Sequence, residues 1–165
     1  TIQLGQNLEL SLDGAVNYPN RVTETRITPA DLILPVLLTP LHSFIYRVTI
    51  IDSSGCEARD SRLIVVSKER RVYIPNIFNP KATGNDLFYV FGGDDVQIVK
   101  IFAIYDRWGN QIFEKKDFLP NDPAAGWDGS YRGAALTSGV FVYYAEVLFI
   151  DGETRLYKGD VTLMR

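Results

Sequence analysis

The feature that most constrains this chain is a series of short apolar runs separated by turn-forming residues. Runs rich in Val, Ile, Tyr, Phe and Thr recur between clusters of Gly, Pro, Asn and Asp, whereas segments of helical periodicity are nearly absent. In "SFIYRVTIID" (43–52) the side chains from Phe44 to Ile50 alternate so that every second one is apolar, which is typical of a strand with one buried face. The pattern predicts an all-β chain.

Two hairpins are predicted in the second half of the chain. "VQIVKIFAIYD" (96–106) is apolar on both faces, as is a strand in the middle of a sandwich. "NQIFEKK" returns after the turn "DRWGN", in which Gly109 is free to take a positive φ. "GVFVYYAEVLFI" and "ETRLYKGDVTLMR" form the other hairpin, with Asp151 and Gly152 as the central pair of a two-residue type I′ turn.

A run of four charged residues, Lys68 to Arg71, separates two strand patterns. Such side chains are not expected to enter either core, so we place a boundary in this run, near Lys68 to Val72. The chain is therefore expected to fold as two immunoglobulin-like β-sandwich domains in tandem, over residues 1–68 and 72–165.

Composition excludes several classes of protein. With 46% hydrophobic residues in 165, the chain can bury a core, and 17 Lys and Arg against 20 Asp and Glu give no basic surface for nucleic acid. No apolar run reaches the roughly 20 residues that cross a bilayer as a helix, so no membrane span is expected. The chain begins at Thr1 without a signal-like leader, so we expect a segment of a longer precursor. In isolation it is expected to be monomeric.

A single His and a single Cys make catalysis and metal binding poor predictions. His42 alone cannot supply a metal site, no Gly-x-Ser-x-Gly motif is present, and the acidic residues lack the spacing of a calcium loop. Cys56 is expected to be a small space-filling residue. The sequence therefore predicts no enzyme, no cofactor and no metal.

The stretch "GWDGSYRG" (126–133) has two interpretations. In the first, Trp127 and Tyr131 stack on sugar rings and Asp128 accepts hydrogen bonds from their hydroxyl groups. In the second, which we favour, a buried Trp anchors a loop whose glycines permit tight turns. We expect Trp127 and also Trp108 to be substantially buried, because large aromatic side chains beside glycines cover the end of a sandwich.

Five ordered blocks carry a family resemblance: "VYIPNIFNPKATGNDLF", "IYDRWGNQIFE", "GWDGSYRG", "LTSGVFVYY" and "KGDVTLMR". Together, over residues 72–165, they resemble the type B C-terminal sorting domain of Bacteroidota, also called the gliding-motility-associated C-terminal domain. The segment before them, residues 1–68, resembles the immunoglobulin-like or PKD-like repeat that often precedes it. A similar Trp-Asp-Gly pattern also occurs in immunoglobulin-like domains of flagellar-hook capping proteins, the structural alternative.

The resemblance implies a non-enzymatic signal that directs a large precursor through the periplasm and the type IX secretion system to the cell surface or the medium. The implied partner is an outer-membrane shuttle or translocon protein, PorV or PorP/SprF-like. An adhesin or carbohydrate-binding module remains the alternative. The residues expected to be read by the machinery are Arg107, Trp108, Gly109, Trp127, Asp128, Gly129, Lys158, Gly159, Leu163 and Arg165. The closing segment from Asp160 to Arg165 is expected to be accessible, as a strand edge or a side-chain patch.

Overall fold

The computed structural model describes residues 1–10, 22–28, 36–52 and 54–165. Apart from the short 3-10 helix η2 (Pro123–Ala125), the regular structure of these residues is β, which confirms the all-β prediction. The chain divides into two compact units, Thr1–Glu69 and Arg70–Arg165. Among the described residues, no helix is long and apolar enough to cross a membrane.

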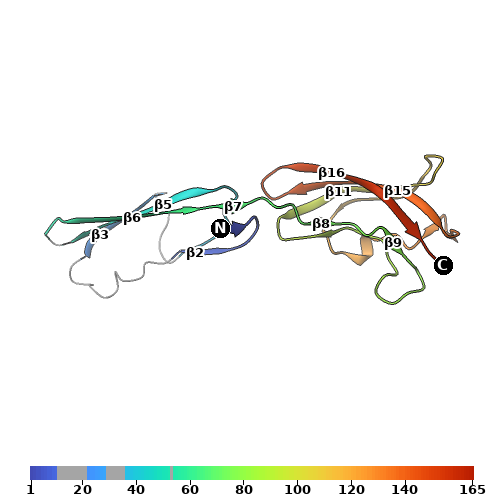
Figure 1. The fold of residues 1–165 in the computed structure, drawn as a ribbon, viewed down its shortest axis with the longest axis horizontal. Coiled ribbons are helices and arrows are strands. Elements are labelled where there is room, and N and C mark those ends of the chain that lie inside the picture. The colour runs from blue at the N-terminus through green and yellow to red at the C-terminus, as the bar shows by residue number, and fades with distance from the viewer. Residues whose placement is uncertain (11–21, 29–35, 53) are drawn as a thin grey trace. The chain divides into compact units, whose positions relative to one another are not determined.

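The described part of the first unit contains three small sheets. Its strands are β1 (Ile2–Gln3), β2 (Leu8–Leu10), β3 (Val22–Thr28), β4 (Val36–Leu38), β5 (Phe44–Asp52), β6 (Glu57–Ile64) and β7 (Val66–Ser67). β1 pairs with β7, β2 with β4, and β5 lies between β3 and β6 (Figure 1).

The buried face of β5 follows the alternation in the sequence. Tyr46 and Val48 are buried and pack with Leu10 of β2, whereas Ile45 is 44% exposed. Cys56, in contrast, is exposed, so the prediction of a space-filling thiol is wrong. It lies in the turn immediately before β6, at the surface of the first unit.

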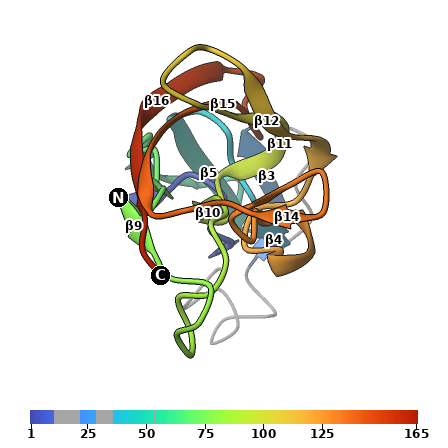
Figure 2. The same ribbon diagram turned by 90° about the vertical axis from the view of Figure 1, so that its right-hand side faces the viewer.

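The second unit is a β-sandwich. Its strands are β8 (Val72–Tyr73), β9 (Ile77–Phe78), β10 (Phe91–Gly92), β11 (Val96–Tyr105), β12 (Gln111–Phe118), β13 (Ser130–Tyr131), β14 (Ala134–Ala135), β15 (Gly139–Phe149) and β16 (Thr154–Leu163). One layer is a five-stranded sheet in the order β12-β11-β15-β16-β9, and β8 and β10 pair in the other layer (Figures 1 and 2). β13 and β14 form a short hairpin at one end.

The core of this sandwich is built by alternation along its long strands. Along β15 and β16 the inward side chains are more buried than their neighbours, whereas in β11 the consecutive residues Phe102, Ala103 and Ile104 are all buried. Several aromatic members stack on one another with ring centroids 5.0 to 5.8 Å apart, a range in which such pairs stabilise beyond their buried area. The buried aromatic side chains of this cluster are Phe78, Phe88, Phe102, Phe118, Trp127, Phe141 and Phe149.

Both long hairpins close with three-residue loops. Gly109 donates its N–H to the Asp106 carbonyl at 3.0 Å and has φ 82°, which confirms the predicted positive φ. In the other hairpin Gly152 donates to the Phe149 carbonyl at 2.9 Å and has φ 83°. A type I′ turn would require positive φ at Asp151 as well, so the predicted two-residue turn is wrong. Asp151 instead turns its carboxylate toward a buried arginine.

That arginine is Arg70, the first residue of the second unit. Only 3% of its side chain is exposed, and its Nη2 donates to Asp151 Oδ2 at 2.9 Å and to Glu153 Oε2 at 2.5 Å. The guanidinium also lies 4.4 Å from the ring centroid of Phe149. The expectation that the whole charged run stays out of a core is therefore wrong for Arg70, because its charge is paired.

Candidate functional site

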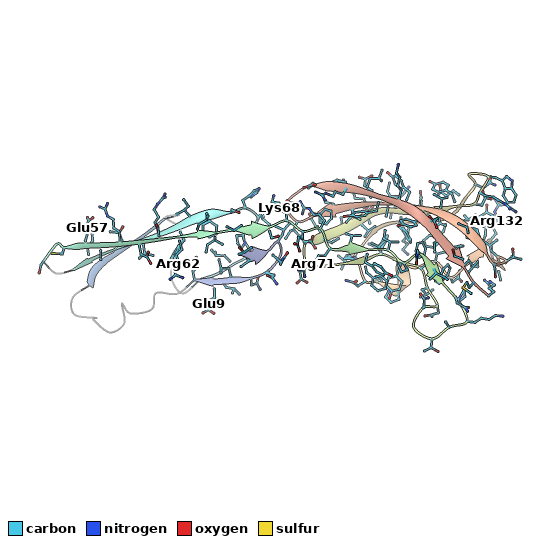
Figure 3. The ribbon with its side chains drawn as sticks, viewed as in Figure 1. Glu9, Glu57, Arg62, Lys68, Arg71 and Arg132 are labelled. Atoms are coloured by element: carbon cyan, nitrogen blue, oxygen red, sulfur yellow. The ribbon has the colours of Figure 1, made fainter. Side chains whose placement is uncertain are left out.

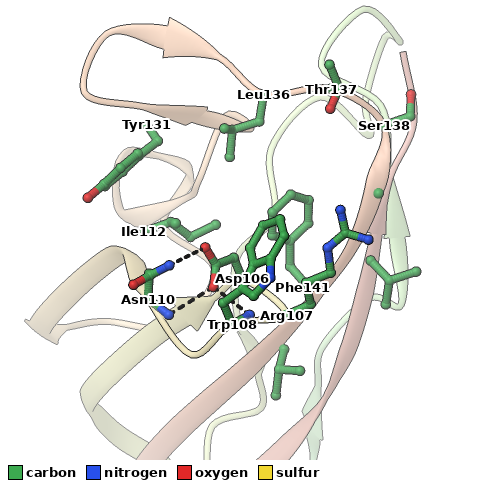
Figure 4. A pocket seen from close by; sticks show the side chains of 13 residues that line it. Asp106, Arg107, Trp108, Asn110, Ile112, Tyr131, Leu136, Thr137, Ser138 and Phe141 are labelled. Atoms are coloured by element: carbon green, nitrogen blue, oxygen red, sulfur yellow. Dashed lines mark hydrogen bonds between the residues drawn. The ribbon is translucent and has the colours of Figure 1, made fainter.

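The Asp106–Asn110 turn is held by the side chain of its first residue. Asp106 Oδ1 accepts hydrogen bonds from the backbone N–H groups of Trp108 and Asn110, both at 2.9 Å. Oδ2 accepts one from Asn110 Nδ2 at 2.8 Å (Figure 4). The bond from the Asn110 side chain, followed by those from backbone N–H groups, lowers the pKa of Asp106 below its ordinary value of 3.8. The hydrogen bonds that the carboxylate accepts therefore hold the turn in its conformation.

This arrangement predicts the titration of Asp106. A carboxyl group with a lowered folded-state pKa stabilises the turn above its unfolded-state pKa, and the contribution is lost as the pH falls through the folded-state pKa. We expect the carboxyl carbon of Asp106 to titrate in NMR with a midpoint below 3.8, and Asn110→Ala to move the midpoint up toward that value. An unchanged midpoint in the variant would contradict the assigned cause.

Trp108 is at the tip of the turn and is 73% exposed, so the prediction that it is buried is wrong. In the three-residue loop Trp108 occupies a central position that projects beyond the sheet, where no core surface is available. The guanidinium of Arg107 lies 4.3 Å from the Trp108 ring centroid and covers one part of the ring. The turn therefore presents an Arg-Trp stack to solvent.

A cleft of ≈ 700 Å³ lies beside this stack. Figure 4 shows Tyr131 and Leu136 across the cleft from the turn that carries Asp106 and Asn110. The lining residues are Asp106, Arg107, Trp108, Asn110, Ile112, Tyr131, Leu136, Thr137, Ser138, Gly139, Val140, Phe141 and Val142. The floor is apolar, and the rim carries hydroxyl and guanidinium groups.

Trp127 lies under the cleft and is 1% exposed, which confirms the prediction that it is buried. Its ring packs edge-on against Phe141 at 5.0 Å, and Nε1 donates to the Ser130 carbonyl at 2.8 Å. Its backbone exchanges two hydrogen bonds with Phe88, both at 2.9 Å. Trp127 therefore supports the cleft from inside.

The loop after Trp127 is hydrogen-bonded to Arg165, which follows the end of β16. Arg165 donates its backbone N–H to Ser138 Oγ and its Nη2 to the Gly129 carbonyl, both at 3.1 Å. Asp128 accepts from Ser130 N and Oγ, and the Ser130 side chain, together with the charge of Arg165, lowers its pKa. The expected accessibility of the closing segment holds only in part, because Leu163 is 0% exposed. The expected free strand edge is wrong for Thr162 and Leu163, since β9 pairs with both.

Gly129 offers a sharp test of this packing. It has φ 76°, and an added Cβ would lie 2.9 Å from Leu163 Cδ1. We expect Gly129→Ala to lower the free energy of unfolding for two reasons. The positive φ costs about 1 kcal/mol in any residue with a Cβ, and the clash with Leu163 adds about 1–3 kcal/mol. Gly133→Ala is the matched control, since Gly133 has φ 78° but nothing within 4 Å of its Cβ position. Equal losses in urea unfolding would contradict the contact with Leu163.

Lys158 and Gly159 lie elsewhere, in the middle of β16. Lys158 is exposed, and Gly159 pairs with Tyr143, whose hydroxyl oxygen would lie 2.8 Å from an added Cβ. The ten predicted residues therefore fall into three places. The first is the turn of Arg107, Trp108 and Gly109. The second is the group around the Gly129–Arg165 hydrogen bond, namely Trp127, Asp128, Gly129, Leu163 and Arg165, and the third is Lys158 with Gly159 on β16.

Sequence reasoning missed most of the cleft. Asn110, Leu136 and Ser138 line it, but their residue types are common in loops and carry no signal of their own. Arg132, whose guanidinium lies 5.0 Å from the Tyr131 ring centroid, was also missed (Figure 3). Repetition of Arg next to an aromatic residue, at 107–108 and again at 131–132, is the one pattern that could have indicated it.

The fold and the cleft define a class, a β-sandwich module whose exposed chemistry suits binding. Among the described residues, no three His, Cys, Asp or Glu side chains come together as metal ligands would. Residues 72–163 match the family model of the CHU_C type IX secretion signal domain. The chain belongs to this family, and the resemblance carried by the five sequence blocks is confirmed. This family is defined by a secretion signal and not by a reaction.

No curated protein matches the chain. Among solved structures, dimeric latent PorU from Porphyromonas gingivalis matches at 14% identity and TM-score 0.38, covering 88% of this chain and 16% of that one. The Bacteroides ovatus mixed-linkage glucan utilization protein SGBP-B matches at 12% identity and TM-score 0.30, and the match covers 100% of this chain and 42% of that one. Fibronectin(III)-like modules of Clostridium thermocellum CbhA match at 12% identity and TM-score 0.27, and the match covers 99% of this chain and 87% of that one. Likenesses this distant carry no argument about function.

Proposed function

We propose that residues 70–165 are a non-enzymatic sorting signal that directs a larger precursor across the outer membrane through the type IX secretion system. The precursor passes through the periplasm and reaches the cell surface or the medium. The partner that reads the signal is an outer-membrane shuttle or translocon protein of the PorV or PorP/SprF kind. Residues 1–68 act as a repeat that separates the signal from the cargo.

The family match over residues 72–163 carries this proposal. It coincides with the second compact unit, Arg70–Arg165, so the matched segment has its own hydrophobic core. A signal of this size is read as a folded surface rather than as a linear peptide, because its predicted recognition residues come from separate turns and strands. Arg107 and Trp108 are exposed, whereas Trp127, Gly129 and Leu163 act as framework beneath the surface.

The experiment is an export assay. A fluorescent reporter with an inner-membrane signal peptide is fused ahead of residues 1–165 and expressed in a Bacteroidota cell that has the type IX system. We expect the reporter at the cell surface or in the medium. In an otherwise identical strain without the system, we expect it to stay in the periplasm. Equal export by both strains would refute the proposal.

The adhesin or carbohydrate-binding alternative rests on exposed aromatic rings. Trp108 and Tyr131 line the cleft and could stack on sugars. Trp127, on which the sequence-based form of this idea depended, is 1% exposed and cannot reach a ligand. A glycan array with titration calorimetry on the positives separates the alternatives, because sugar binding that is lost in Trp108→Ala would favour an adhesin.

A further inference from the structure

β15 has an open backbone edge beside the cleft. β11 ends at Tyr105, whose partner on β15 is Val142. In an antiparallel ladder alternate residues turn their amides to the same side, and Phe149 turns its N–H toward the β16 side. By this alternation Val142 and Val140 turn theirs toward β11, which does not extend as far as Val140. Among the described strands, none pairs with Val140 on this edge.

The guanidinium of Arg107 lines the cleft beside this edge, and that of Arg132 lies on the ring of Tyr131, another lining residue. Arg107 lies on the Trp108 ring and Arg132 on the Tyr131 ring, at 4.3 and 5.0 Å, and both rings line the cleft. In the described part of the chain neither guanidinium makes a hydrogen bond or an ion pair. A stacked guanidinium keeps its in-plane N–H groups available, and their geometry matches a carboxylate.

The remaining charges near the cleft do not compete for these donors. Asp106 accepts three hydrogen bonds within its own turn. Asp128 accepts two from Ser130 and lies near the charge of Arg165. Asp160 pairs with Val142 on the far side of β15 from the Arg107 turn. The cleft therefore offers the open cation of Arg107 above an apolar floor, with Arg132 next to the lining residue Tyr131.

We propose that this cleft binds an extended polypeptide segment in which acidic residues flank an apolar or aromatic residue. The inference rests on the proposed function, since it describes how a proteinaceous partner reads the signal. The peptide main chain hydrogen-bonds to the open edge at Val140, as an added strand does. Its apolar side chain occupies the floor of Ile112 and Phe141, and one of its carboxylates binds Arg107, with Arg132 on the Tyr131 ring adding positive charge nearby.

A polypeptide fits this site better than a glycan does. An open strand edge supplies one donor and one acceptor at the spacing of another strand, which a sugar does not match. Part of each aromatic ring is already covered by a guanidinium, so less of it is free to stack on a pyranose. The side chains on the floor, such as Ile112 and Leu136, have no hydrogen-bonding groups for hydroxyls.

A random twelve-residue peptide library displayed on phage tests the site on immobilised residues 1–165. We expect enriched peptides in which Asp or Glu alternates with aromatic or branched residues. Their affinity should fall at least about tenfold for Arg107→Glu and for Trp108→Ala, the loss expected when a charged hydrogen bond or a stacked ring is removed. Lys115→Glu, an exposed change of equal charge on β12, should leave affinity unchanged. Circular dichroism establishes that each variant is folded.

Other outcomes would overturn the inference. These are a library without enrichment, enriched peptides without acidic residues, or peptides that bind Arg107→Glu as well as the original chain. If a glycan binds residues 1–165 and this binding is lost in Trp108→Ala, the cleft is a sugar-binding site instead. Self-association that Trp108→Ala abolishes would assign it to a second copy.

The export assay separates this inference from the proposed function. Export of the reporter that depends on the type IX system tests the function alone. If it holds and Arg107→Glu with Trp108→Ala abolishes export, the cleft is the surface that is read. If the double variant is exported normally, the inference is wrong and the function stands. If the unaltered fusion is not exported, the function fails whatever the peptides show.

Discussion

Trp127→Ala is expected to lower the free energy of unfolding of the second unit by roughly 3–5 kcal/mol, the usual cost of removing a buried Trp. The side chain is 1% exposed and packs on Phe78 and Phe141, at 5.3 and 5.0 Å between ring centroids. The variant also leaves the Ser130 carbonyl without its indole donor. Urea unfolding followed by circular dichroism measures the loss.

Trp108→Ala is the matched control, because it removes the same side chain from a site that is 73% exposed. The contact of its ring with Arg107 is lost, which is worth about 0.5–1 kcal/mol at an exposed site. Similar losses in the two variants would contradict the difference in burial. Because both tryptophans of the chain lie in the second unit, fluorescence reports the unfolding of that unit alone.

Arg70→Met is expected to have the other large effect. The side chains of Arg70 and Asp151 are 3% and 2% exposed, so removing the cation leaves a buried anion that no longer receives the charged hydrogen bond from Arg70. Breaking such a buried pair costs about 3–5 kcal/mol. The measurement is urea unfolding followed by tryptophan fluorescence, which comes from the second unit alone.

The second substitution Asp151→Asn distinguishes the charge from the packing. Added to Arg70→Met it removes the buried negative charge while keeping a residue suited to turns, and we expect about 2 kcal/mol to be recovered. Glu153 is 42% exposed and remains hydrated, so it needs no such change. A double variant no more stable than Arg70→Met would show that the cost comes from the lost contact with the Phe149 ring instead.

The parts of the fold that sequence reasoning reached depend on local rules. Alternation in β5 predicted the buried face of Tyr46 and Val48, and a glycine after a polar turn predicted the positive φ of Gly109. These features need only neighbouring residues. The burial of Trp127 was also predictable, because two glycines flank the Trp127–Asp128 pair in a tight loop.

The features that were predicted wrongly or not at all depend on contacts between residues distant in sequence. The exposure of Trp108 is decided by the loop length, which sets whether its ring lies over the sandwich or beyond it. The burial of Arg70 depends on a carboxylate 81 positions away. The cleft forms because the Asp106–Asn110 turn approaches the segment that leads into β15, and no spacing in the sequence fixes that distance.

The parallel pairing of β9 with β16 has a mechanical consequence. Thr162 donates its N–H to the Asn76 carbonyl at 2.8 Å, and Met164 donates to Phe78 at 3.0 Å, so the two strands run in the same direction. Tension applied between Arg70 and Arg165 pulls these strands along their length in opposite directions. Both hydrogen bonds are then loaded together in shear, and neither can open before the other. A precursor held under load through this unit would resist extension as a clamp does.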